Sequence, residues 1–141
     1  MNLIFDKLAL FYRYIFYKLY IWTGIVNMRR EPDEIQATIM ITTTIYMYIL
    51  GAVTFLLIIN INVLSIFGYS SVAVILFYIV LLFLNLYILK YQIGFKKIIQ
   101  EFKSETEQQA RRGNILVTCY MLGALLIIYI AFYSVYLHEH A

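Results

Sequence analysis

The fold is decided by a stretch without a single charged side chain, residues 35–59, IQATIMITTTIYMYILGAVTFLLII. A helix of about 20 apolar residues crosses the hydrocarbon core of a bilayer, where it satisfies its own backbone hydrogen bonds. The whole chain of 141 residues has the same character, with 63% hydrophobic and 13% charged residues and a mean hydropathy of +0.80. Soluble domains carry about 25% charged residues, so this chain lacks the polar surface that water requires. The composition predicts an integral membrane protein.

The other spans follow from the spacing of charges and turn residues. No Asp, Glu, Lys or Arg occurs from residue 35 to residue 89, a length sufficient for two spans. Asn, Gly and Ser gather in residues 60–71, so we expect a turn there and a second span at residues 71–91. Another uncharged stretch predicts a third span at residues 115–137. The predicted fold class is an all-α integral membrane protein with three transmembrane helices.

The polar parts of the chain set the expected boundaries. Pro32, Asp33 and Glu34 suit a first helical turn, which separates an N-terminal segment, residues 1–34, from the membrane domain, residues 35–137. Between the second and third spans, residues 92–114 are expected to continue the second helix into the cytoplasm, because apolar residues recur there at helical spacing. Gly113-Asn114 predicts the turn into the third span, and residues 138–141 form a short outer tail.

The basic residues predict the orientation of the chain. Five of the eleven Lys and Arg residues precede the first span and the other six lie between residues 90 and 112. Basic residues beside spans are retained on the cytoplasmic side. We therefore expect a cytoplasmic N-terminus and an outer C-terminus, in the cytoplasmic (inner) membrane of a bacterium.

The N-terminal segment mixes aromatic rings with cations in residues 11–22, FYRYIFYKLYIW. On a helix, the apolar side chains form one stripe and the cations fall on the remaining arc. Tyr and Trp rings prefer the bilayer interface, and Lys and Arg reach phosphates from there. The pattern predicts an amphipathic helix lying in the plane of the interface. Its expected interface residues are Phe11, Ile15, Leu19 and Trp22 towards the acyl chains, and Lys7, Arg13 and Lys18 towards the headgroups.

A fourth span is the stronger alternative for this segment, because residues 8–26 hold only two charges. Arg13 and Lys18 near its middle would each cost about 2.5–3.5 kcal/mol on insertion scales, against about 0.3–0.6 kcal/mol gained per Leu, Ile or Phe. A cleavable signal peptide would need small residues at a cleavage site, and none of that pattern follows. The sequence favours the in-plane helix.

Three residues inside the spans are candidates for helix packing. Asn85 lies below the headgroups, where an amide needs a partner. We expect an interhelical hydrogen bond for it, with a pore-lining or substrate-contacting role as the alternative. The run Thr42-Thr43-Thr44 can bond its own helix carbonyls. Cys119 and Gly123 form a small-xxx-small pair, which predicts the closest helix contact on the third span.

Residues able to carry chemistry are few. His138, Glu139 and His140 are weak candidates for zinc or copper ligands, because adjacent residues at a terminus form a poor ligand set. Both histidines are terminal and Cys119 lies in an apolar stretch, so the sequence predicts no catalytic triad or dyad. We expect no enzyme activity and no cofactor. The small excess of basic residues suits lipid headgroups and not nucleic acid.

Two functions compete at this stage. The first is a non-enzymatic scaffold or accessory subunit that assembles in the lipid bilayer with itself or with a larger membrane-protein partner. The second is a homo-oligomeric pore or membrane-perturbing protein, with Asn85 or the threonine run as the pore wall. A small transporter, a subunit of an enzyme and a lipid-binding protein are further alternatives.

Overall fold

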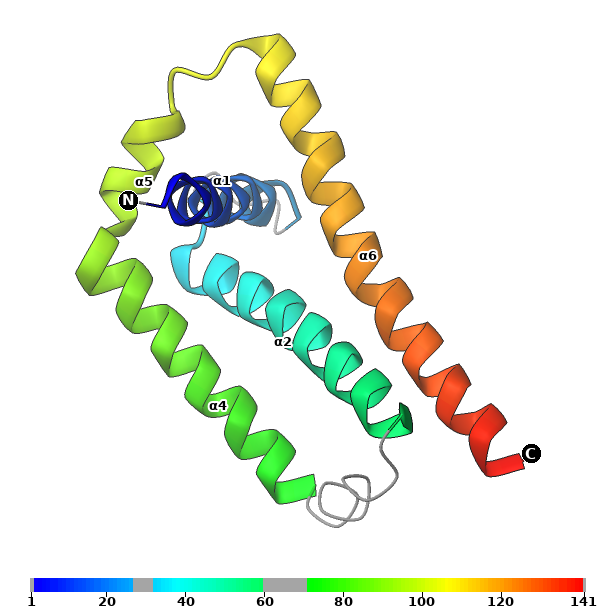
Figure 1. The fold of residues 1–141 in the computed structure, drawn as a ribbon. Helices are drawn as coiled ribbons and strands as arrows, with labels where there is room; N and C mark the ends of the chain where they lie inside the picture. Colours follow the sequence, from blue (N-terminus) through cyan, green and yellow to red (C-terminus); the bar gives the residue numbers. More distant parts are fainter. Residues whose placement is uncertain (1, 27–31, 60–70, 141) are drawn as a thin grey trace.

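The computed structural model describes residues 2–26, 32–59 and 71–140, and these are almost entirely helical (Figure 1). The turn predicted at residues 60–71 lies, except for residue 71, outside the described residues. In chain order the elements are α1 (Leu3–Val26), α2 (Glu34–Ile59), α4 (Ser71–Tyr87), the π-helix η1 (Ile88–Ile93), α5 (Phe95–Phe102) and α6 (Glu107–His140).

Three stretches of helix are long and apolar enough to cross a membrane, which confirms the predicted three-span fold. They are Glu34–Leu56, Val72–Ile93 and Glu107–His140. α6 has 34 residues and is therefore about 50 Å long at 1.5 Å per residue, against roughly 30 Å for the hydrocarbon core. Its polar first turns consequently extend beyond the hydrocarbon, on the other side of α1 from α5 (Figure 1).

The three spans lie side by side with α2 in the middle (Figure 1). α4 runs antiparallel to α2, and one of the bonds joining them runs from the Tyr46 hydroxyl to the carbonyl of Val74, at 3.0 Å. α6 runs parallel to α2, and the Tyr48 hydroxyl donates to the carbonyl of Tyr120 at 2.6 Å. α2 packs against both α4 and α6, whereas α4 and α6 hardly contact each other, so the described parts of the spans form one layer of helices and not a closed bundle.

Small residues bring α2 and α6 together. At Gly51 of α2, an added Cβ would fall onto the Cγ2 methyl group of Ile127 in α6. At Gly123 of α6, an added Cβ would lie 2.5 Å from the Tyr48 hydroxyl of α2. Ala124 and Ala131 of α6 are buried along the same helix. Without a hydrophobic driving force between helices in lipid, such close backbone approach gives the packing contacts that hold spans together.

The predicted helical extension after the second span is present as α5 and the start of α6, but it is not continuous with the second span. α4 passes into η1, whose end is closed by a 2.9 Å hydrogen bond from the Gly94 N–H to the Leu89 carbonyl. Gly94 has a φ of 86°, a conformation that side chains with a Cβ rarely adopt, so the chain turns there and α5 begins. The apolar face of α5 is retained, since Phe95 and Ile98 are buried.

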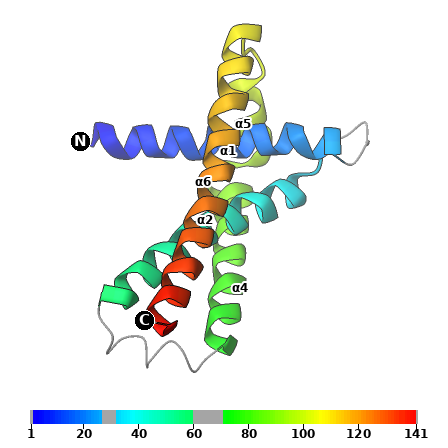
Figure 2. The same cartoon turned by 90° about the vertical axis from the view of Figure 1, so that its right-hand side faces the viewer.

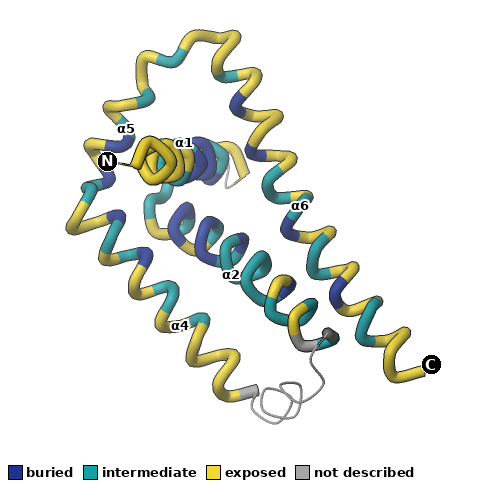
Figure 3. The backbone as a smooth tube through the Cα atoms, in the orientation of Figure 1, coloured by how far each residue is buried: buried dark blue, intermediate teal, exposed yellow. Residues whose placement is uncertain are grey.

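α1 lies across the three spans instead of alongside them (Figure 2). Its first nine residues are exposed on all sides, whereas the stretch from Ile15 to Leu19 is buried. Figure 3 shows the buried residues concentrated where α1 meets the neighbouring helices. The core there draws residues from five elements: Ile15, Phe16, Tyr17 and Leu19 of α1, Ala37 and Ile41 of α2, Leu89 of η1, Phe95 and Ile98 of α5, and Val117 of α6. The hydrophobic core of this protein is therefore the crossing point of α1.

We predict that Gly51→Leu weakens the contact between α2 and α6. The new side chain meets a β-branched Ile127 that has no free rotation to give way, so the free energy of unfolding should fall by about 1–3 kcal/mol. Ala52→Leu is the matched control, because Ala52 is exposed on the next position of the same helix. Thermal unfolding of the purified protein in detergent measures both variants. Equal stability of the two would contradict the close approach at Gly51.

Candidate functional site at the crossing of α1 and the spans

Asn85 joins three helices through its side-chain amide. The amide Nδ2 donates to Thr42 Oγ1 of α2 at 3.1 Å, and Oδ1 accepts from the Tyr12 hydroxyl of α1 at 2.9 Å. Asn85 is only 5% exposed. The amide thus finds both partners within the chain, which removes the reason to seek a partner in a second copy.

The threonine run next to this amide is also bonded inside the chain. The hydroxyls of Thr42, Thr43 and Thr44 donate to carbonyls three or four residues earlier in α2, at 2.7–3.1 Å. Thr43 is further bonded to the Tyr78 hydroxyl of α4 at 3.0 Å. These polar groups therefore stabilise helix packing and leave no row of unpaired hydroxyls for a pore wall.

Lys18 and Glu105 form an ion pair on the opposite side of α1. The Lys18 Nζ lies 2.8 Å from both carboxylate oxygens of Glu105, and the two side chains are 3% and 9% exposed. The carboxylate also accepts from the Tyr14 hydroxyl at 2.6 Å, and Nζ makes a further 3.4 Å contact with the Ala110 carbonyl. A buried pair is stable only when additional hydrogen bonds complete its shell, and both partners here have them.

Burial raises the pKa of the Tyr14 hydroxyl, and the hydrogen bond to Glu105 and the charge of that carboxylate raise it further. Burial, followed by the same charge, also raises the pKa of Tyr17. Both phenols are therefore held in the neutral form, which is the form in which Tyr14 donates its hydrogen bond to Glu105.

Aromatic stacking and a second ion pair align α1 with α5. Phe16 stacks on Phe95 with ring centroids 5.5 Å apart, and Tyr17 lies against Phe102 at 5.6 Å. Arg13 pairs with Glu101 at 3.2 Å, but their side chains are 29% and 34% exposed. Exposed pairs contribute little, so packing and the Lys18–Glu105 pair hold this contact.

Gly113 marks the place where α1 crosses α6. An added Cβ there would fall onto the Tyr14 hydroxyl and lie 2.8 Å from Lys18 Cε. α6 continues through Gly113 and Asn114 without a break, so the turn predicted at this pair is wrong. The glycine provides space for the side chains of α1 and does not end a helix.

The predicted interface residues divide into two groups in the structure. Lys7 and Phe11 are exposed, and Arg13 and Trp22 are partly buried. Ile15, Lys18 and Leu19 are buried in protein, with exposures of 2%, 3% and 0%. The expectation that these three residues face lipid is therefore corrected, because protein contacts enclose their side chains.

The remaining candidates lie on α6. Cys119 is exposed, while Gly123 packs against Tyr48, so the two do not act as one packing pair. His138, Glu139 and His140 lie exposed on the last turn, where His140 stacks on Tyr136 with ring centroids 4.2 Å apart. Among the described residues, no group of three His, Cys, Asp or Glu side chains is placed to hold a metal ion.

Comparison with other proteins leaves the function to be argued from this geometry. No protein-family model, curated protein or solved structure matches the chain.

Sequence reasoning missed Glu105, Tyr12 and Tyr14 as partners. The available signal was the presence of acidic residues, among them Glu101 and Glu105, inside a mainly basic segment. Each of the two pairs with a cation of α1. Sequence spacing alone does not identify these pairs. Arg13 and Glu101 are 88 residues apart, and Lys18 and Glu105 are 87 residues apart.

We predict that Glu105→Gln destabilises the protein strongly, because it leaves the Lys18 ammonium buried without a counter-charge. Loss of one partner of a buried pair costs about 3–5 kcal/mol, whereas Glu101→Gln, at the exposed pair, should cost about 1 kcal/mol or less. The fluorescence of Trp22, the one Trp in the chain, can follow unfolding in detergent. The double variant Lys18→Met/Glu105→Gln should regain stability over Glu105→Gln. Similar losses at Glu101 and Glu105 would contradict the role of the buried pair.

Proposed function

We propose that the chain is a non-enzymatic scaffold or accessory subunit of a membrane complex. The single layer of spans supports this, because a layer exposes two broad faces that other helices or lipid must cover. Buried residues make up 22% of the apolar stretch of α2, but only 11% of that of α4 and 17% of that of α6. Large apolar side chains are exposed along α4 and α6, among them Phe83 at 69% and Phe132 at 62%. Such faces suit assembly with a larger membrane protein or a second copy.

The alternative, a homo-oligomeric pore or membrane-perturbing protein, has less support from the side chains. The groups expected to line a pore, Asn85 and Thr42 to Thr44, are hydrogen-bonded within the chain. Conducting pores need polar or charged linings that remain accessible to the permeating species. A pore would therefore require other residues for its wall.

The proposed orientation places the N-terminus in the cytoplasm and the C-terminus outside, in the cytoplasmic membrane if the chain is bacterial. The described basic residues support it, because they all lie on α1 or in the segment from Lys90 to Arg112. Figure 2 shows that α1, α5 and the start of α6 lie at the same end of the molecule. One end of the layer is therefore basic, and such ends are retained on the cytoplasmic side.

We predict that reporter fusions after Ala141 report the outer side and insertions at Ser104 report the cytoplasm. Both follow from three spans with the basic end inside. A reporter pair such as alkaline phosphatase and green fluorescent protein reads opposite sides and provides its own control. An inner location of Ala141 would require an even number of spans and would refute the orientation.

We predict that the purified chain in liposomes passes no more ions than protein-free liposomes. In gently solubilised native membranes it should instead migrate in an assembly well above its own 16.7 kDa plus detergent. Purified protein in the same detergent is the matched control for migration. Ion flux that rises with the amount of protein would favour the pore, and migration as a monomer from native membranes would exclude the accessory subunit.

A further inference from the structure

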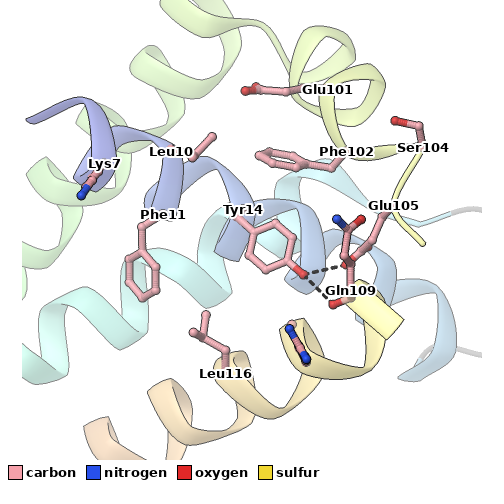
Figure 4. Close-up of a pocket in the computed structure, with 12 residues that line it drawn as sticks. Lys7, Leu10, Phe11, Tyr14, Glu101, Phe102, Ser104, Glu105, Gln109 and Leu116 are labelled. Carbon is pink, nitrogen blue, oxygen red and sulfur yellow. Dashed lines mark hydrogen bonds between the residues drawn. The ribbon is translucent and has the colours of Figure 1, made fainter. Parts of the chain in front are cut away.

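A pocket opens between α1, the connection from α5 to α6, and the first turns of α6 (Figure 4). Its volume is about 570 Å³, within the usual range for small-molecule sites. Its polar wall includes Ser104 and Gln109, and its apolar wall includes Phe11 and Leu116. Figure 4 shows Phe11 and Leu116 on the opposite side of the pocket from Glu101 and Ser104. The pocket is therefore lined by both polar and apolar side chains.

The charges of the pocket favour an anion. Glu101 and Glu105 line it, but Arg13 and Lys18 neutralise them from outside the lining. Lys7 and Arg112 also line it, and neither forms an ion pair or a hydrogen bond within the described part of the chain. Two exposed cations thus face one pocket with no counter-charge of their own.

The position of the last charged residue of α6 before its uncharged stretch indicates how deep the pocket lies in the membrane. Arg112 is the last charged residue before an uncharged stretch that extends from Gly113 to His138. A basic residue at the end of a span lies at the headgroup layer, and Leu116 lies about one helical turn deeper. The pocket consequently crosses from the headgroups to the first part of the acyl chains.

We propose that this pocket binds an anionic phospholipid of the same leaflet. Lys7 and Arg112 contact the phosphate and the charged headgroup, and Phe11 and Leu116 contact the start of an acyl chain. A lipid fits both walls of the pocket, whereas a free phosphate would fit only the cations. The site is independent of whether the chain serves as an accessory subunit.

The test measures lipid binding to the purified full chain in detergent by native mass spectrometry, with dioleoyl phosphatidylglycerol as the probe. Lys7→Gln/Arg112→Gln should weaken binding about thirtyfold, the effect expected for the loss of two basic residues close to an anionic headgroup. The control Lys96→Gln/Lys97→Gln removes the same charge from two exposed residues of α5 that do not line the pocket. It should leave binding within about twofold of the unchanged protein, since surface charges outside the pocket are screened.

Further measurements distinguish between the possible ligands, and a further variant distinguishes a loss of binding from misfolding. Dioleoyl phosphatidylcholine should bind at least several-fold more weakly, and neither inorganic phosphate nor glycerophosphoglycerol should displace the lipid at equal concentration. The exchange variant Lys7→Arg/Arg112→Lys keeps both charges and should retain binding. Equal losses in the pocket and control variants, equal binding of the two lipids, or displacement by the chain-free anions would each overturn the proposal.

Discussion

The buried ion pair between Lys18 and Glu105 is the interaction on which the arrangement of this protein depends. It joins the in-plane helix to the connection between α5 and α6, and so brings the polar ends of the second and third spans to one place. Two charges taken out of water are stable together only with a complete set of hydrogen bonds, which Tyr14 and the Ala110 carbonyl supply. The two buried charges must keep these positions to remain paired, so the ion pair determines where α1 crosses α6.

Asn85 provides the complementary anchor on the membrane side. On a helix of 3.6 residues per turn, Tyr12 points away from Tyr14 and Lys18, so α1 is held from opposite faces. One face bonds to Asn85 within the spans, and the other bonds to Glu105 above them. This explains how a helix rich in aromatic residues and cations is buried in protein at its centre. Its polar groups meet partners on both sides, and its rings fill the space between them.

The sequence was sufficient for the three spans and for a separate N-terminal helix, because both follow from the distribution of charge over long stretches. The sequence was insufficient to predict the environment of the Lys18 side chain. An isolated amphipathic helix would place Lys18 among the headgroups. Its partner Glu105 lies 87 residues away, a relationship that periodicity cannot reveal. The turn predicted at Gly113 is wrong, and the turn at Gly94 was not predicted, for a related reason. Glycine serves both close approach and chain reversal, and only the crossing side chains at Gly113 and the positive φ at Gly94 distinguish the two uses.

The anchored position of α1 also constrains how the spans sit in the membrane. If α1 and Arg112 lie at one membrane interface, the uncharged part of α6 from Gly113 to His138 extends about 39 Å beyond it at 1.5 Å per residue. The hydrocarbon core is roughly 30 Å thick, so this helix must tilt or carry its last turns into the headgroups of the opposite leaflet. The exposed Tyr129, Tyr133 and Tyr136 lie on these last turns, at the depth where tyrosine rings prefer to reside. Tilt and an aromatic belt at the opposite interface together accommodate the excess length, and the crossing helix α1 holds the N-terminal end of α6 in place.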